Sequence, residues 1–182
     1  KNVFACFQAT FMQRAIDQIF HDICYTKVPI TIVSARSGFS GYDGPTHHGI
    51  YDFGFLRTLP NIEIFYAGTK RDLKAILEER YRKAKSPMII LHPYELISPL
   101  QDQFLPKKIS PLDRMECIEE GTEGIIIALG NKLIDAINLK KMLFEKKKQN
   151  FAVYNLRWVN PLPIKDLKFL LRKYKKAITL EE

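Results

Sequence analysis

Long apolar runs are missing from this chain of 182 residues. The longest run, residues 124–129, has the length of a buried strand, whereas a membrane-spanning helix needs about 20 apolar residues. The first residues also lack the basic flank, apolar stretch and small-residue cleavage site of a secretory signal. We therefore expect neither a membrane span nor a membrane partner.

Paired cysteines are missing as well. The chain has an odd number of cysteines, namely Cys6, Cys24 and Cys117. They lack a C-x-x-C spacing and have no histidine at the spacing of zinc ligands. We expect free thiols in a reducing compartment, and hence a cytoplasmic location, or a plastid-type organelle if the protein is eukaryotic. With 46% hydrophobic residues, 9 Gly and 10 Pro, the composition excludes a disordered, collagen-like or coiled-coil protein.

An excess of basic charge is present only in the last third. The formal net charge is +8, and after residue 121 the chain has 13 Lys and Arg against 6 Asp and Glu. Such an excess can mark a nucleic-acid surface. The cations lie, however, at the ends of predicted helices, as in the run 146–148, where they suit the helix dipole. We therefore predict solvated helix ends and no nucleic-acid partner.

Short apolar runs alternate with amphipathic stretches over residues 1–92, a pattern typical of βα units around a mainly parallel sheet. Thr10 is placed to cap the first helix, in which Phe11, Ala15, Ile19 and Ile23 recur on one side. Strands are predicted at residues 3–7, 30–34, 62–66 and 88–91. Helices are predicted at residues 10–25 and 70–85.

A second βα series occupies residues 121–182. It contains predicted strands at 124–129, 151–156 and 177–180, and predicted helices at 133–147 and 163–174. Residues 93–120 are rich in proline and have little periodicity, so we interpret them as a linker. The predicted fold is α/β, with two βα-type domains at 1–92 and 121–182, each built on a mainly parallel sheet.

A glycine-rich stretch without regular period, residues 35–59, follows the second predicted strand. It contains Arg36, Asp43, His47 and His48. Long loops at the carboxyl ends of parallel strands usually have a function. Arginine can hold a phosphate or carboxylate, and imidazole can move a proton near neutral pH. Each residue alone fits a surface loop, but together they predict a functional site.

Other sites are not indicated. Neither a G-x-G-x-x-G turn nor a Walker phosphate loop occurs, so the chain has no nucleotide fingerprint. The adjacent side chains of His47 and His48 point apart on an extended backbone, so no metal site is predicted. His21 and His92 lie within or beside regular elements, and we interpret both as structural.

Two runs of sequence are distinctive. Residues 10–22 read TFMQRAIDQIFHD, and residues 41–49 read GYDGPTHHG. Both closely resemble the 1-deoxy-D-xylulose 5-phosphate synthases, a transketolase-like family of thiamine diphosphate enzymes, and residues 52–61 and 156–163 are similar to the same family. The resemblance implies the later part of a pyrimidine-binding domain and the opening of a transketolase C-terminal domain. We therefore expect a fragment in which both domains are truncated.

The resemblance also implies roles for individual residues. Phe11 matches the aromatic residue that packs on the aminopyrimidine ring of the cofactor. Arg14 matches an active-site arginine, Asp43 a polar residue that faces the substrates, and His47 a histidine that transfers protons. Arg36 matches the arginine that faces the phosphate of glyceraldehyde 3-phosphate.

The implied activity is that of a transketolase-type transferase. The family condenses pyruvate with glyceraldehyde 3-phosphate, with loss of carbon dioxide, to 1-deoxy-D-xylulose 5-phosphate for the biosynthesis of isoprenoid precursors, thiamine and pyridoxal. The resemblance implies thiamine diphosphate and Mg²⁺ as cofactors, with the magnesium ligands in a domain before residue 1. It also implies a homodimer of the complete protein, so we expect the fragment alone to be inactive.

Four positions depart from the family: Gln8, Ala35, Leu91 and Tyr94. Tyr94 replaces a second arginine that faces the phosphate, and losing such a contact weakens binding about ten- to hundredfold. Candidates to compensate are Lys107, Lys108 and Arg114. The alternatives are a degenerate, non-catalytic transketolase-like protein, or another member of the superfamily such as a transketolase or the β component of a 2-oxo acid dehydrogenase.

Overall fold

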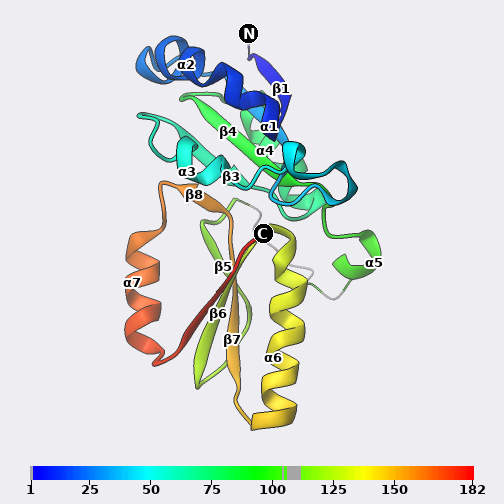
Figure 1. Ribbon diagram of the computed structural model, residues 1–182. Helices are drawn as coiled ribbons and strands as arrows, with labels where there is room; N and C mark the ends of the chain where they lie inside the picture. The colour runs from blue at the N-terminus through cyan, green and yellow to red at the C-terminus, as the bar shows by residue number, and fades with distance from the viewer. Residues whose placement is uncertain (1, 104, 106–111) are drawn as a thin grey trace.

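The computed structural model describes residues 2–103, 105 and 112–182. In Figure 1 the chain forms two α/β units, one above the other, with the C-terminus at their junction. The first sheet has the strand order β1-β2-β4-β3-β8 and the second the order β5-β7-β6-β9. The predicted α/β class with mainly parallel sheets is confirmed.

Four strands of the first sheet are parallel. The central strand β4 is almost wholly buried, because a parallel strand covered on both faces is apolar throughout. A fifth strand, β8 (Trp158–Asn160), comes from far along the chain and pairs antiparallel with β3. The parallel strands are β1 (Phe4–Gln8), β2 (Thr31–Ser37), β3 (Glu63–Tyr66) and β4 (Met88–Pro93).

The predicted first helix is present but irregular. It consists of α1 (Ala9–Met12), a 3-10 turn η1 (Gln13–Ala15), α2 (Ile16–Gln18) and a π-helix η2 (Ile19–Tyr25). The prediction that Thr10 caps this helix is wrong, because the helix begins earlier, and the Thr10 hydroxyl instead donates to the His48 carbonyl at 3.2 Å. That contact ties the helix to the glycine-rich loop.

The second helix of this unit, α4 (Lys70–Arg82), covers the opposite face of the sheet. Its start is fixed by a capping box. The Asp72 amide donates to the Thr69 hydroxyl at 3.0 Å, and the Thr69 amide donates to the Asp72 carboxylate at 3.2 Å. This arrangement holds Asp72, which is fully buried, at the end of α4 that faces the second unit.

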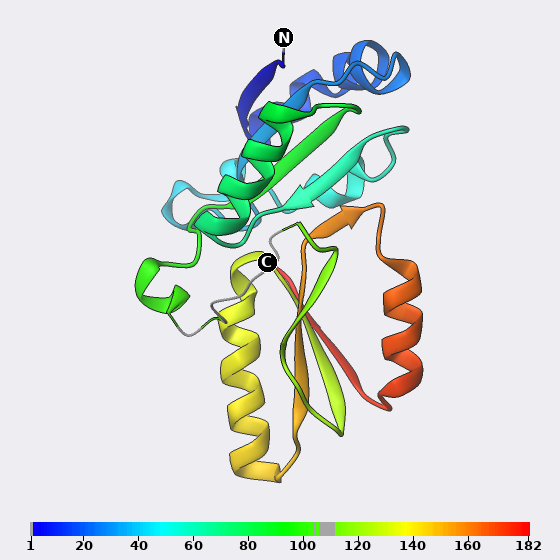
Figure 2. The same ribbon diagram turned by 180° about the vertical axis from the view of Figure 1, so that it is seen from behind.

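The second unit agrees with its predicted elements. The strands β6 (Gly124–Leu129), β7 (Phe151–Leu156) and β9 (Ala177–Leu180) are parallel. The helices α6 (Leu133–Lys147) and α7 (Ile164–Lys173) pack on opposite faces of the sheet, as Figures 1 and 2 show. No helix in the described part of the chain is long and apolar enough to span a membrane.

The segment predicted as a linker, residues 93–120, contains two regular elements. A short helix, α5 (Pro99–Asp102), is capped by Ser98, and β5 (Met115–Glu119) pairs antiparallel with β7 in the second sheet. Residues 104 and 106–111 lie outside the described part of the chain, and Lys107 and Lys108 are among them. The predicted domain boundaries stay a prediction.

The two units meet closely at their junction. Gly130, which precedes α6, has a φ of +64°, and a Cβ there would lie 2.2 Å from Cε1 of Tyr66 on β3. Arg157, between β7 and β8, forms ion pairs with Asp72 on α4 and Glu116 on β5. The junction is therefore packed with side chains from both units.

Candidate functional site

The glycine-rich loop begins at the end of β2 and folds back on that strand. The Gly49 amide donates to the Gly38 carbonyl at 2.7 Å. A Cβ at Gly49 would lie 2.8 Å from the Arg36 carbonyl oxygen and 2.9 Å from Cβ of Ala9, so only glycine fits without a shift. The loop is thereby pressed against the start of the first helix.

Two 3-10 turns and a short helix shape the rest of the loop. They are η3 (Gly41–Asp43), η4 (Pro45–His47) and α3 (Asp52–Leu56). Gly44, between the turns, has a φ of +79°, a conformation that glycine adopts without the steric cost met by other residues. The turns place the side chains of Asp43 and His47 beside residues from β2 and α1.

Arg36 lies between two groups of the chain. Its Nη1 donates to Oδ2 of Asp43 in an ion pair, and its Cζ lies 4.8 Å from the centre of the Tyr94 ring. The backbone of Arg36 has a φ of +64°, an uncommon conformation for a residue with a side chain. The contact with Tyr94 has the geometry of a cation–π interaction.

Phe11 and His47 form the second contact of the site. Their ring centres lie 5.4 Å apart with an interplanar angle of 80°. The Thr46 hydroxyl lies 3.0 Å from Nδ1 of His47, so that nitrogen is engaged within the loop. The Phe11 ring remains 46% exposed. The pair thus presents an accessible aromatic face beside an imidazole.

His48 has different contacts from its neighbour. The Ser40 amide donates to Nδ1 of His48 at 3.1 Å, which makes that nitrogen an acceptor. The Phe39 ring packs edge-on against the imidazole, with the centres 5.3 Å apart. His48 therefore stabilises the loop. Among the described residues, no three His, Cys, Asp or Glu side chains are grouped so that they could hold a metal ion.

Not every predicted residue joins this arrangement. The structure brings Phe11 to His47 and Arg36 to Asp43. Arg14 lies on η1, is exposed and forms no ion pair with any residue in the described ranges. The roles that the sequence predicted for these five residues stay predictions.

Arg114 does not provide a replacement cation at the loop. Its Nη1 donates to the Pro161 carbonyl at 2.9 Å, and its guanidinium lies 5.0 Å from the centre of the Trp158 ring. Both contacts are to residues of β8 or the chain just after it. Arg114, one of the candidates to replace the positive charge that is absent at Tyr94, is thus engaged elsewhere.

Asp52 is a buried carboxyl group that sequence reasoning assigned no role. It is 1% exposed, and neither carboxylate oxygen is in hydrogen-bonding geometry with a partner in the described structure. Burial raises its pKa to about 6, and the nearby Ser37 side chain lowers it in part. The signal in the sequence was an acid next to an apolar run at residues 53–56, which marks a helix start but not its depth.

Tyr66 lies beside the same residues. Its hydroxyl donates to the Ser37 carbonyl at 3.4 Å. Burial raises the pKa of Tyr66, and the negative charges of Glu182 and Asp52 raise it further. Tyr66 thus lies near two carboxyl groups, those of Asp52 and Glu182.

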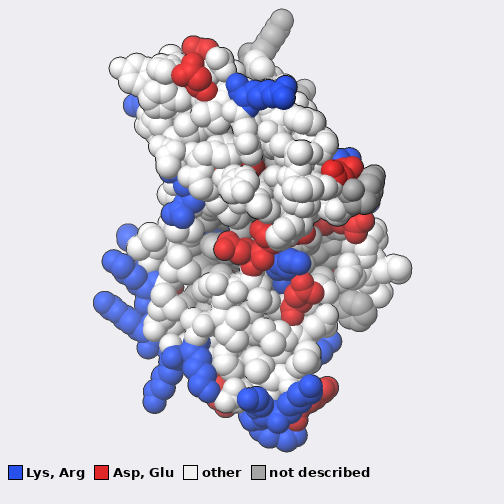
Figure 3. All heavy atoms as spheres, in the orientation of Figure 1, with Lys and Arg blue, Asp and Glu red and all other residues white. Residues whose placement is uncertain are grey.

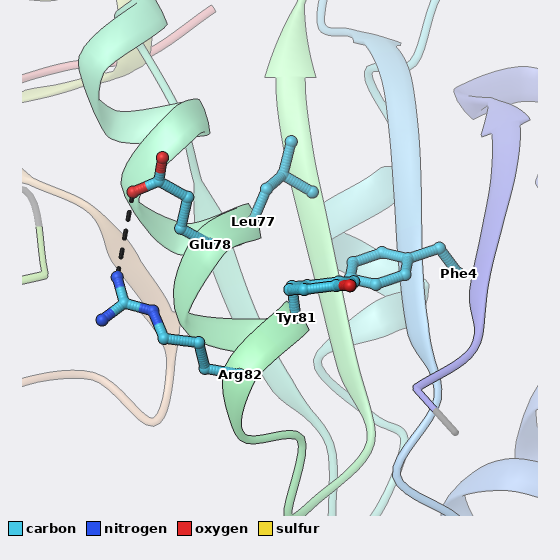
Figure 4. Close-up of a pocket in the computed structure, with 5 residues that line it drawn as sticks. All are labelled: Phe4, Leu77, Glu78, Tyr81 and Arg82. Carbon is cyan, nitrogen blue, oxygen red and sulfur yellow. Dashed lines mark ion pairs between the residues drawn. The ribbon is translucent and has the colours of Figure 1, made fainter.

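A roomy hollow lies away from the loop, between β1 and α4. It has a volume of about 570 Å³ and is lined by Phe4, Leu77, Glu78, Tyr81 and Arg82. Figure 4 shows Phe4 and Tyr81 directed toward each other across it, while Glu78 and Arg82 pair at 3.9 Å on its rim. Its lining has no histidine, cysteine or serine, so we place the candidate site at the loop.

The surface charges follow the secondary structure. Figure 3 shows Lys and Arg gathered over the lower unit and acidic side chains across the middle of the molecule. The last turns of α6 and α7 contain Lys146, Lys147, Arg172 and Lys173, where cations suit the helix dipole. This placement agrees with the interpretation of the basic excess as helix ends.

Comparison with known proteins identifies two domains. Residues 1–98 match the transketolase pyrimidine-binding domain, and residues 113–182 match the transketolase C-terminal domain. Together these matches leave only a short segment around α5 unassigned.

Curated relatives are named 1-deoxy-D-xylulose-5-phosphate synthase. The protein of Lawsonia intracellularis is 36% identical over 180 residues, which are 98% of this chain and 28% of that protein. The protein of Nitratidesulfovibrio vulgaris is 31% identical over 179 residues, with the same coverage. The chain therefore spans little more than a quarter of the length of these relatives.

A solved structure has the same fold over almost the entire chain. It is a split gene transketolase, described as an inactive beta4 tetramer, with a TM-score of 0.80 and 25% sequence identity. The match covers 98% of this chain and 57% of that one.

Proposed function

The chain belongs to the transketolase family, and from this premise we propose that it forms part of a 1-deoxy-D-xylulose 5-phosphate synthase. The proposed reaction condenses pyruvate with glyceraldehyde 3-phosphate and releases carbon dioxide. The observation that best supports it is the loop that brings Phe11 to His47 and Arg36 to Asp43 at the carboxyl end of β2. Ligand sites of open parallel sheets lie at this edge.

The ring of Phe11 on α1, beside His47 of the loop, fits the aromatic part of thiamine diphosphate. Phe11 is nearly half exposed beside an imidazole, and an exposed aromatic ring packs well on a planar heteroaromatic group. The cofactor, when bound, supplies the electron sink for decarboxylation. We propose that the diphosphate and Mg²⁺ are held by another part of the enzyme, in a homodimer of the complete protein.

Four polar residues of the candidate site have proposed tasks. His47, whose Nδ1 is next to the Thr46 hydroxyl, exchanges a proton with the substrates at Nε2. Arg36 faces the anionic end of the acceptor aldehyde, and Asp43 accepts a hydrogen bond from an acceptor hydroxyl. Arg14, exposed on η1, adds positive charge near the reacting groups.

The stacking of Arg36 on Tyr94 favours a second candidate, a transketolase-like protein that has lost catalysis. In that case the loop would keep its shape without turning over substrates.

We also propose a cytoplasmic location. The three cysteines are free, which is compatible with a reducing compartment.

The test follows carbon dioxide release from pyruvate by the complete enzyme with thiamine diphosphate and Mg²⁺, with and without glyceraldehyde 3-phosphate. The synthase predicts release that depends on the acceptor and is lowered at least a hundredfold by His47→Asn. His21→Asn, which changes an exposed histidine on η2, is the matched control and should leave the rate unchanged. No release from folded native protein under either condition would favour the non-catalytic candidate.

A further inference from the structure

The Arg36 guanidinium is already paired within the chain. The Asp43 carboxylate accepts a hydrogen bond from Nη1, and the Tyr94 ring lies 4.8 Å from Cζ. The two partners come from different elements, Asp43 from η3 in the loop and Tyr94 from the chain just after β4. Asp43 pairs with the positive charge of the arginine, and together the two partners hold its side chain in one orientation.

A phosphate monoester that reaches Arg36 has to compete with Asp43. Both groups are anions that accept hydrogen bonds from the same guanidinium. The exchange replaces one charge-assisted hydrogen bond with another, so the net gain is smaller than at an arginine without a carboxylate partner. The phosphate then adds little to the binding of an acceptor.

The surroundings of the pair do not strengthen the attraction. A hollow of about 390 Å³ opens beside Tyr94, and its lining includes both Lys70 and Glu95, whose opposite charges offset one another. On the other side of the loop the Glu182 side chain lies against Gly38, with Cγ 2.9 Å from the position that a Cβ would take. A dianion therefore gains no net formal charge from Lys70 and Glu95 in the hollow, and it meets the Glu182 carboxylate on the other side.

We propose that Tyr94 is a positioning residue that sets acceptor selectivity. It holds Arg36 against Asp43, so the site distinguishes little between a phosphorylated and an unphosphorylated hydroxyaldehyde. This inference rests on the proposed function, because it concerns the acceptor of the same reaction.

The experiment titrates the complete enzyme with glycerol 3-phosphate, an unreactive phosphate monoester, and follows the Arg36 Nε–Hε signal by ¹⁵N NMR. The Arg36→Lys variant assigns that signal by its loss. Tyr94→Arg, which adds a second cation, should lower the dissociation constant about ten- to hundredfold. Tyr94→Phe, the matched control, keeps the ring and should leave both the signal and the dissociation constant unchanged.

Two results would overturn the proposal. One is native protein that binds glycerol 3-phosphate as tightly as Tyr94→Arg. The other is a Tyr94→Ala variant in which the Arg36 signal keeps its native position, because the ring would then not position the guanidinium. If Tyr94→Arg fails to fold, Asp43→Asn serves instead, since removal of the competing carboxylate should also tighten binding.

The titration separates this inference from the proposed function. It involves no turnover, so a failure of the carbon dioxide assay would reject the synthase and leave the measured phosphate affinities standing. Tight phosphate binding by the native chain would reject only the role of Tyr94.

Discussion

Arg157 and Asp72 form a buried ion pair, with 2.8 Å between Nε and Oδ1 and only 1% and 0% of the two side chains exposed. The pair joins the β7–β8 connection of the second unit to the first turn of α4. Glu116 on β5 takes part as well, 2.6 Å from Nη2 of the same guanidinium. Because a buried charge without a partner is costly, each of these groups depends on the others.

Replacement of Arg157 should therefore destabilise the protein strongly. Arg157→Met keeps much of the side-chain volume but leaves the Asp72 carboxylate buried and unpaired by arginine. We expect the free energy of unfolding to fall by about 3–5 kcal/mol, measured by urea denaturation at pH 7.

The matched control is Lys74→Met, which removes a cation from an exposed pair with Glu78 at 3.8 Å on the same helix. Exposed pairs of this kind contribute about 0.3–0.5 kcal/mol. Equal losses in the two variants would contradict the idea that the buried pair holds the junction.

Asp52 makes the stability depend on pH. Its pKa is raised from 3.8 to about 6 by burial, so the folded protein retains a proton that the unfolded chain releases between these values. The contribution of this group to stability is therefore complete below pH 3.8 and is lost as the pH rises through 6. For a change of this size the loss is about 3 kcal/mol.

Asp52→Asn should remove that dependence. We expect the difference in unfolding free energy between the variant and the native protein to favour the variant more at pH 7 than at pH 4. Urea unfolding across this pH range measures that difference. Asp17→Asn, which changes an exposed carboxylate on α2, is the control. Parallel stability curves for native protein and Asp52→Asn would show that the carboxyl group does not retain its proton.

The second unit was predicted closely because its local signals agree with its packing. The predicted bounds 124–129, 133–147, 151–156 and 177–180 are those of β6, α6, β7 and β9. The strands β6 and β7 are short, largely apolar runs that are mostly buried, so composition marks them, whereas β9 is a short run at the more exposed edge of the sheet. The long helix has enough turns for its apolar spacing to be clear.

The missed strands are those defined by distant partners. The three residues of β8 form a strand because they reach β3, and β5 pairs antiparallel with β7 at a bulge. The first helix also differs from the regular helix that was predicted. Its apolar residues recur at a spacing of four, wider than the 3.6 of an α-helix, and η2 winds as a π-helix there.

The sequence marked the loop as a candidate site by its composition, but it did not predict the contacts that the structure shows there. Residue types and the end of a strand were sufficient to mark Arg36, Asp43 and His47 as a cluster. The stacking of Arg36 on Tyr94 joins residues far apart in the sequence, and no local pattern predicts it. The same holds for Asp52, since its burial depends on how the loop packs against Ser37 and Tyr66.

The cysteines should differ sharply in reactivity. Cys6 is exposed on β1, whereas Cys24 is buried on η2, where burial raises the pKa of its thiol to about 11. Because the thiolate is the reactive form, a disulfide reagent at pH 8 should label Cys6 within minutes and Cys24 only after unfolding. Cys6→Ser should abolish the fast phase seen in native protein, and rapid labelling that persists in this variant would contradict the assignment.

Gly49 and Gly54 allow the close packing of the loop to be tested within one segment. A Cβ at Gly49 would meet the Arg36 carbonyl oxygen at 2.8 Å and the backbone of Ser37 at 2.9 Å, and such atoms cannot move aside singly. Gly49→Ala should therefore cost about 1–3 kcal/mol in urea unfolding and shift the NMR signals of Arg36. Gly54 lies within α3 with open space around it, so Gly54→Ala should stabilise the protein by about 0.5–1 kcal/mol. If both variants were equally stable, the loop could not be pressed against β2 and α1 as the structure shows.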